Sequence, residues 1–285
     1  MAMVPDLRSL GVNSSSRVFA VLGDPVAHSL SPVFQQAALR AIGLDAVYVA
    51  LRVSAEDLAS VAHSLCASGG GGNVTLPHKE RMAALVERPS DAVRRTGACN
   101  TFWFEEGQLA GDNTDVIGVQ RSVDRLLARA PEGARVLLVG AGGAARAAAV
   151  ALLDAGVAAL EVGNRTASRA EQLVADLNDP RLRAVDLTTC LTGASYDLVI
   201  NATRLGLHSE DPFPLALESP QQAGAVLDMV YTHPHETRWV QHLKDLGINA
   251  IDGREMLLQQ GAAAFERWWS MPAPIEAMRF ALERS

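Results

Sequence analysis

Cysteine is scarce in this chain of 285 residues, and the few cysteines do not pair. Cys66, Cys99 and Cys190 are far apart and odd in number, so the sequence predicts neither a disulfide framework nor a cysteine zinc site. His233 and His235 are the closest histidines, but a proline separates them and no third ligand is near. We therefore expect no metal, and a reducing, cytoplasmic location fits best.

Long apolar runs and an excess of positive charge are also missing. No stretch approaches the roughly 18 apolar residues of a membrane-spanning helix. Met1–Ser16 has no apolar core behind a basic start, so we expect a short disordered lead rather than a signal peptide. The net charge is −7, whereas nucleic acids bind clustered lysine and arginine. We expect no membrane or nucleic-acid partner.

Apolar residues make up 48% of the chain and charged residues 20%, which is typical of a folded globular protein. The length favours two domains. The first half alternates strands and helices, which predicts parallel strands with helices between them. We expect strands at Arg17–Gly23 and Val47–Val53, and helices at Val33–Ile42 and 55–67, the second capped by Ser54.

Ser29 and Ser31 stand at the start of the first of these helices. Ser31 is followed by Pro32, a pattern typical of an N-cap and a first helical residue. Free backbone N–H groups and the helix dipole favour an anion there, such as a carboxylate. The alternative, favoured by spacing alone, is that both serines only cap the helix and turn the chain.

The third strand of this half leads into a lysine. Gly72–Lys79 alternates apolar and polar residues until Pro77 ends the strand in a turn. Taken alone, Lys79 is more simply a solvated surface cation. Two later segments, Thr96–Thr101 and Gly111–Asp115, are rich in Asn, Thr and Asp. Asp115 could be only an N-cap, yet such loop-end side chains are what recognition of a polyhydroxylated small molecule requires.

The second half opens after a composition break at Ala130–Gly133. Arg135–Val139 is a continuous apolar run, as expected of a strand buried on both faces. Gly140–Ala145 follows as G-x-G-x-x-A and leads into an alanine-rich helix. A glycine pattern alone is weak, but a strand before it and a helix after it predict a dinucleotide pyrophosphate at the helix N-terminus.

The next strand, Leu160–Gly163, bears on the choice of cofactor. No carboxylate follows it, and Glu161 lies too early to bind a ribose hydroxyl. Arg165 and Arg169 do follow it, and arginine accommodates a 2′-phosphate. The sequence therefore favours NADP, although the two arginines could also be a solvated helix start. Further strands are expected at 182–187, 196–200, 225–231 and 248–251, and the last helices at 252–268 and from Pro274 to Glu283.

With these segments in place, the sequence resembles the shikimate dehydrogenase family. The matching motifs occur in the family order between about residues 17 and 270: Gly23-Asp24-Pro25 with His28–Pro32, Asn73–Lys79, Gly97–Thr101, Asn113-Thr114-Asp115, Gly140–Ala144, Asn164-Arg165-Thr166, Asn201-Ala202-Thr203, Asp228–Tyr231 and Met256–Gln260. The sequence departs from the family at Gln35-Gln36, at Gly71-Gly72 and at Arg204.

The resemblance implies a cytoplasmic, NADP-dependent oxidoreductase that interconverts 3-dehydroshikimate and shikimate in aromatic amino-acid biosynthesis, as a monomer or homodimer. Lys79 and Asp115 would form its catalytic pair. Its substrate-binding residues would be Ser29, Ser31, Asn73, Thr75, Asn100, Tyr231 and Gln260. Its cofactor-binding residues would be Gly140, Gly142, Gly143, Ala144, Asn164, Arg165, Thr166, Arg169, Thr203, Gly253 and Met256.

The resulting prediction is an α/β protein with two domains and the active site where they meet. Residues 1–116 would bind the substrate, 117–252 would form a Rossmann NADP-binding domain, and 253–285 would return as helices to the substrate domain. A quinate, quinate/shikimate or aminoshikimate dehydrogenase is the nearest alternative. An NADP-binding regulator without catalysis is the alternative from another class.

Overall fold

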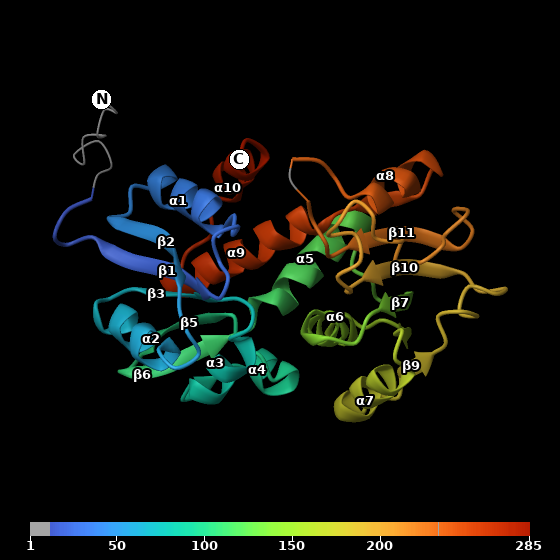
Figure 1. Ribbon diagram of the computed structural model, residues 1–285, viewed down its shortest axis with the longest axis horizontal. Coiled ribbons are helices and arrows are strands. Elements are labelled where there is room, and N and C mark those ends of the chain that lie inside the picture. Colours follow the sequence, from blue (N-terminus) through green and yellow to red (C-terminus); the bar gives the residue numbers. More distant parts are fainter. Residues whose placement is uncertain (1–11, 233) are drawn as a thin grey trace. The chain divides into compact units, whose positions relative to one another are not determined.

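The computed structural model describes residues 12–232 and 234–285, so the expectations for residues 1–11 and for His233 lie outside the described residues. The chain forms two compact units (Figure 1). The first unit contains the described residues up to Thr114 together with Gly261–Ser285, and the second unit is Asp115–Gln260. The sequence placed the second break earlier, at 252/253. Within the described ranges, no helix is long and apolar enough to cross a membrane.

The first unit is built on a six-stranded sheet in the order β2-β1-β3-β5-β6-β4. Its first three strands in this order are parallel, and β5 is antiparallel to both β3 and β6. The sheet is therefore mixed. Its strands are β1 (Arg17–Gly23), β2 (Ala46–Arg52), β3 (Gly71–Val74), β4 (Arg88–Pro89), β5 (Thr101–Glu105) and β6 (Gln108–Asp112).

The helices of the first unit bury apolar side chains against this sheet. Phe34, Phe102 and Met82 are fully buried. Its helices are α1 (Ser31–Ala41), α2 (Leu58–Ala67), α3 (Lys79–Leu85), α4 (Asp91–Thr96), the end of α9 (Gly253–Trp269) and α10 (Ile275–Glu283). Helix α4 was not predicted from the sequence, and Ser90 caps it by accepting from the Val93 amide at 3.2 Å.

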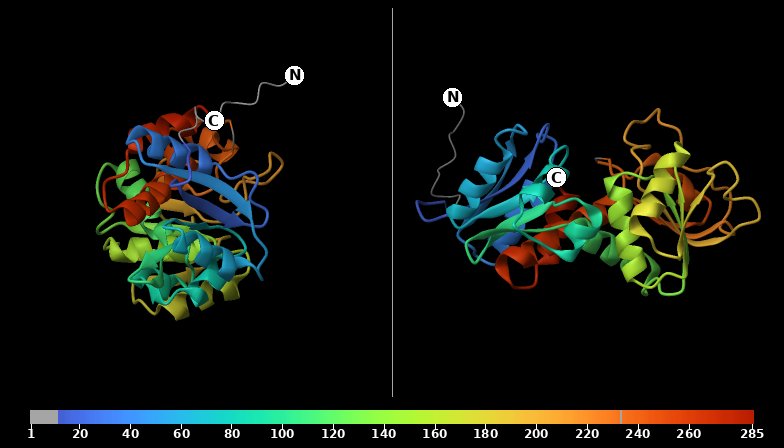
Figure 2. Two further views of the ribbon diagram at one scale, coloured as in Figure 1. Left: turned by 90° about the vertical axis from the view of Figure 1, so that its left-hand side faces the viewer. Right: turned by 90° about the horizontal axis from the view of Figure 1, so that it is seen from below.

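The second unit is a parallel sheet of six strands in the order β12-β11-β10-β7-β8-β9. Its strands are β7 (Arg135–Val139), β8 (Ala159–Gly163), β9 (Leu182–Val185), β10 (Tyr196–Asn201), β11 (Ala223–Asp228) and β12 (Asn249–Ile251). Helices α6 (Gly143–Asp154) and α7 (Ala167–Leu177) lie on one face and α8 (Arg238–Asp245) on the other (Figures 1 and 2). With α5 (Thr114–Leu127) before β7, this is the doubly wound order of a dinucleotide-binding sheet.

Several local expectations were wrong. Ser31 does not cap α1 but is its first residue, because Leu30 already has helical φ and ψ angles of −83° and −7°. Ser54 does not open α2 directly, because its hydroxyl accepts from the Asp57 amide at 3.2 Å and holds a turn first. β11 ends at Asp228 rather than at 231.

The end of the expected disordered lead is also ordered. Asn13 donates to the Asp45 carboxylate at 3.2 Å, and Ser15 donates to it at 3.0 Å. Ser16 bonds to the same carboxylate, and its hydroxyl is the main cause of the lowered pKa of Asp45. Residues 13–16 therefore form a turn that leads into β1.

Candidate active site

Asn73 lies at the centre of a buried hydrogen-bond network in the first unit. Its Nδ2 donates to the Asn100 carbonyl at 3.1 Å and to Thr101 Oγ1 at 2.9 Å. Its Oδ1 accepts from the hydroxyl of Tyr48 at 2.7 Å. Because both amide hydrogens are used, Asn73 can offer a ligand only a lone pair on Oδ1. It is therefore suited to accept from a ligand hydroxyl.

Asn100 has the complementary arrangement. Its Oδ1 accepts from the Thr114 amide at 2.8 Å, from the Thr114 hydroxyl at 3.0 Å and from the Thr101 hydroxyl at 2.9 Å. These bonds occupy the oxygen and fix the orientation of the Asn100 amide. Asp115 follows Thr114 directly in the first turn of α5. The anchored Thr114 peptide therefore fixes where the Asp115 side chain begins.

Lys79 is held through its backbone and through the residue before it. Its carbonyl accepts from the Cys99 amide at 2.9 Å, one residue before Asn100. His78 is buried, and its Nε2 donates to the Val53 carbonyl at 2.7 Å. The turn that follows β3 is thus fixed to the end of β2. It brings Lys79 to the segment that carries Asn100.

Ser29, Ser31 and Thr75 lie at the same edge of the first sheet. The Ser29 hydroxyl accepts from the Ser31 amide at 3.3 Å, and the Thr75 amide donates to the Leu22 carbonyl at 2.8 Å. The Ser31 hydroxyl lies beside the buried phenol of Tyr48. Burial raises the pKa of Tyr48 above its ordinary value, an effect that the Ser31 hydroxyl partly offsets. Tyr48 is therefore a neutral donor that links Ser31 with Asn73.

Asp115 and Gln260 lie on two helices that pack closely within the second unit. A Cβ built on Gly118 of α5 would lie only 2.8 Å from Gln260 Cβ and 3.2 Å from the Met256 carbonyl oxygen, both in α9. A larger residue would force the helices apart. Asp115 is about one turn before Gly118, so this contact keeps Asp115 and Gln260 near each other. Met256, expected to bind cofactor, is buried in the same region.

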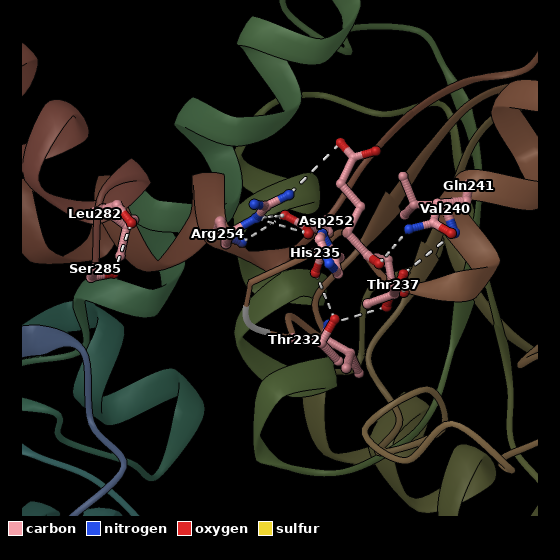
Figure 3. Close-up of polar contacts among 12 residues, drawn as sticks. Thr232, His235, Thr237, Val240, Gln241, Asp252, Arg254, Leu282 and Ser285 are labelled. Atoms are coloured by element: carbon pink, nitrogen blue, oxygen red, sulfur yellow. Dashed lines mark hydrogen bonds and ion pairs between the residues drawn. The ribbon is translucent and has the colours of Figure 1, made fainter.

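Tyr231 belongs to the loop that follows β11 in the second unit. The Gly253 amide donates to the Val230 carbonyl at 2.9 Å, so Gly253 fixes this loop to the start of α9. Burial raises the pKa of Tyr231, which keeps it a neutral phenol. Figure 3 shows the polar contacts around the loop, which join Thr232 with His235, Thr237 with Val240, and Arg254 with Asp252.

A cavity of about 440 Å³ lies in the second unit beside the ends of β7, β8 and β10. Most of the expected cofactor residues line it: Gly140, Gly142, Asn164, Arg165, Thr166, Arg169 and Thr203. Arg204, a departure from the family pattern, lines it as well. Gly143, Ala144, Gly253 and Met256 are not among the lining residues.

The turn between β7 and α6 explains why this cavity suits a dinucleotide. Gly140 has φ +119°, and a Cβ there would lie 2.9 Å from the Ala202 carbonyl oxygen, so only glycine fits. A Cβ built on Gly142 or Gly143 would meet nothing within 4 Å. The start of α6 is therefore open to a ligand, and its free N–H groups favour a phosphate.

Comparison with known proteins identifies the family. Three family models match: "Shikimate dehydrogenase substrate binding domain" at residues 21–102, "Shikimate / quinate 5-dehydrogenase" at 124–208 and "Shikimate 5'-dehydrogenase C-terminal domain" at 253–283. A shikimate dehydrogenase (NADP(+)) of Halobacterium salinarum is 42% identical over 269 residues, 93% of this chain and 98% of the relative. The chain belongs to the shikimate dehydrogenase family.

Solved structures agree with this assignment. Shikimate 5-dehydrogenase of Thermus thermophilus, in complex with NADP(H) and shikimate, is 38% identical with a TM-score of 0.82, covering 94% of this chain and 99% of the other. The 5-ketofructose reductase of a Gluconobacter species is 31% identical with a TM-score of 0.83, covering 94% and 98%. The predicted family, α/β fold class and enzyme class are therefore confirmed, and the name of the Halobacterium salinarum relative contains the predicted cofactor, NADP.

Two residues of this site in the shikimate dehydrogenase fold were missed from sequence. In the sequence, Tyr48 is an ordinary aromatic residue of a strand. Only the pairing of three strands brings it to Asn73. His78 lies within the Asn73–Lys79 motif, but the resemblance implies no role for it. A buried histidine next to a candidate catalytic lysine could have suggested an anchor for the turn.

Within residues 12–232 and 234–285, no group of three or more His, Cys, Asp or Glu side chains could hold a metal ion. The pair considered from sequence includes His233, which lies outside that range. Cys66, Cys99 and Cys190 are free and buried. Burial raises the pKa of Cys99 to about 12, so this thiol beside Asn100 is not a nucleophile at neutral pH.

Proposed function

We propose that this chain catalyses the reversible, NADP-dependent reduction of 3-dehydroshikimate to shikimate in aromatic amino-acid biosynthesis. The observation that carries the proposal is the hydrogen-bonded cluster that joins Asn73, Asn100 and the backbone of Lys79. Asn73 offers an acceptor, which suits a hydroxyl of the ring, and Asn100 beside it would bind another hydroxyl. Ser29, Ser31 and Tyr231 would bind the carboxylate, and Thr75 and Gln260 would bind further hydroxyls.

Lys79 and Asp115 are proposed as the catalytic pair. Bound NADPH would supply the hydride to the ketone carbon, and negative charge then builds on the ketone oxygen. The Lys79 ammonium would stabilise that charge and give its proton to the oxygen, which completes the hydroxyl. Asp115 would orient Lys79 and the substrate.

The use of basic residues in this chain supports a proton-transfer role for Lys79. The sequence contains 23 arginines but only two lysines, Lys79 and Lys244. Lys244 is a surface residue that pairs with Glu236 at 2.6 Å. Arginine cannot release a proton in a protein, whereas lysine can. Apart from Lys79 and Lys244 the chain uses arginine, so the lysine at this turn supplies a proton that an arginine there could not release.

The cavity of the second unit is proposed as the NADP site. Gly140 and Gly142 would hold the pyrophosphate, and Arg165 and Arg169 would bind the 2′-phosphate. Asn164, Thr166 and Thr203 line the same cavity. Gly143 and Ala144 lie at the start of α6, whose free N–H groups would bind a phosphate. Gly253 and Met256 would position α9 beside the cofactor. The three buried thiols fit the reducing cytoplasm, where we expect this enzyme to act.

The test is a steady-state comparison of shikimate and quinate, each with NADP and NAD. We expect shikimate with NADP to give the highest kcat/KM. Lys79→Ala should lower kcat by roughly 10²–10⁴-fold, the contribution of general acid–base catalysis. Lys244→Ala, the matched lysine control, should leave it unchanged. Near-normal turnover by Lys79→Ala would contradict the catalytic assignment, and a preference for quinate would favour the quinate dehydrogenase alternative.

The similarity to a 5-ketofructose reductase supports one further candidate, a keto-sugar reductase. A keto-sugar carries no carboxylate, so Ser29 and Ser31 separate the two functions. If the chain reduces 5-ketofructose faster than 3-dehydroshikimate, and Ser29→Ala leaves the KM of either compound unchanged, the sugar assignment is the better one.

A further inference from the structure

Three arginines that line the cavity of the second unit have no partner for their charge among the residues that the structure describes. Within the described residues, the guanidinium groups of Arg165, Arg169 and Arg204 make no hydrogen bond or ion pair, although all three line the cavity. By contrast, Arg146 of the neighbouring helix α6 pairs with Asp176. Unpaired guanidinium groups around one cavity favour a ligand with more than one anionic group.

These arginines lie on opposite sides of the turn that follows β7. Arg165 and Arg169 come after β8, whereas Arg204 comes after β10, and β7 lies between those two strands in the sheet. Gly140 contacts both sides. Its amide donates to the Gly163 carbonyl of β8 at 2.8 Å, and a Cβ built on it would lie 2.9 Å from the Ala202 carbonyl oxygen after β10.

The segment that carries Arg204 is held rigidly. Asn201 Oδ1 accepts from the Thr203 amide at 3.0 Å and from the Thr203 hydroxyl at 2.7 Å. Thr203 Oγ1 in turn accepts from the Leu205 amide at 3.1 Å. The Asn201 amide donates to the buried Asp228 carboxylate at 2.8 Å. A backbone fixed in this way keeps Arg204 at the edge of the cavity before a ligand arrives.

In a sheet of this strand order, the pyrophosphate of a dinucleotide lies over the first turn, and the adenosine ribose lies towards the second strand, here β8. We propose that Arg204 binds the pyrophosphate, at the phosphate nearer the nicotinamide ribose. Arg165 and Arg169 then select NADP through its 2′-phosphate, whereas Arg204 strengthens binding of NADP and NAD alike. This inference rests on the proposed role of the cavity as the cofactor site.

Calorimetric titration of the full chain with NADP, NAD and 2′,5′-ADP tests the proposal. The last compound carries the 2′-phosphate but lacks the second phosphate of the pyrophosphate. Arg204→Ala should weaken NADP and NAD by the same factor, about tenfold for a charge-assisted contact, and leave 2′,5′-ADP unchanged. Arg165→Ala is the matched control on the other side of the turn. It should weaken NADP and 2′,5′-ADP but not NAD.

Two results would overturn the role of Arg204. In one, Arg204→Ala leaves NAD binding unchanged. In the other, it weakens 2′,5′-ADP as much as NADP, which would place Arg204 with the 2′-phosphate. If the unaltered chain binds none of the three compounds, the cofactor assignment of the cavity fails, and the role of Arg204 fails with it. Unfolding temperatures should match across the variants, because neither guanidinium makes a bond within the described structure.

Discussion

Replacing Tyr48 with phenylalanine should weaken substrate binding although, in our assignment, Tyr48 contacts no substrate. Its hydroxyl donates to Asn73 Oδ1 at 2.7 Å, and Tyr48 is only 4% exposed. The opposite end of the Asn73 amide is fixed by bonds of 3.1 Å to Asn100 and 2.9 Å to Thr101. Tyr48→Phe removes one oxygen and leaves the ring in place, so it tests the hydroxyl alone.

The expected size of the effect follows from the bond that is lost. A buried hydrogen bond contributes about 1 kcal/mol net, and a buried group left unpaired costs about 1–3 kcal/mol. The free energy of unfolding should therefore fall by about 1–2 kcal/mol. Asn73 is then less well oriented for the substrate. If this weakens substrate binding by about 1 kcal/mol, the KM for shikimate rises roughly fivefold.

Urea unfolding and steady-state kinetics measure the two effects separately. The KM for shikimate should rise while the KM for NADP stays constant. Tyr196→Phe is a matched control, because the Tyr196 hydroxyl is also buried and donates to Glu161 at 2.8 Å, but in the second unit. It should lower stability without changing the KM for shikimate. In a double-mutant cycle, Tyr48→Phe should raise the KM for shikimate little further when Asn73→Ala is already present. An unchanged KM for shikimate, or fully additive effects, would refute the coupling and leave Tyr48 a structural residue.

Three further predictions concern single groups. Lys79→Arg keeps the positive charge but not the transferable proton, so its kcat should stay far below that of the unaltered enzyme. A near-normal kcat would instead show that Lys79 acts as an electrostatic anchor. Ser29→Ala should raise the KM for shikimate with little change in kcat. An unchanged KM would show that this serine only stabilises its turn. Burial raises the pKa of Asp228 to about 6. The protonated carboxyl therefore contributes up to about 3 kcal/mol to the free energy of unfolding. This contribution is fully present below about pH 4 and is lost as the pH rises through 6. Asp228→Asn should flatten this pH dependence in urea unfolding, and an unaltered profile would show that Asp228 is not its source.

The parts of this structure that were predictable are those that local sequence determines. The strand Arg135–Val139 was predicted with the bounds that the structure has, because a strand buried on both faces is a continuous apolar run. The turn after it has a backbone conformation that requires glycine, so a short glycine motif in the sequence reveals it. Ser31 shows the limit of local rules, because the preceding Leu30 entered the helical region and moved the helix start.

Tyr48 could not be found by such reasoning, because its role depends on two strand pairings. Tyr48 pairs with Phe19 of β1, and β1 pairs on its other side with β3, where Val21 faces Asn73. Side chains from β2 and β3 thus approach each other across β1, although they are far apart in sequence. No periodicity within either strand contains this information.

The direction of the hydrogen bonds determines what the site can recognise. The Tyr48 hydroxyl donates to Asn73, the Asn73 amide donates to Thr101, and the Thr101 hydroxyl donates to Asn100. Because each link uses a donor of one residue and an acceptor of the next, the orientation of both amides is fixed along the whole chain of bonds. Asn73 must then accept from any ligand group that it meets. A ring that presents a donating hydroxyl to Asn73 fits, whereas one that presents only an accepting oxygen there would bring two acceptors together, which cannot form a hydrogen bond.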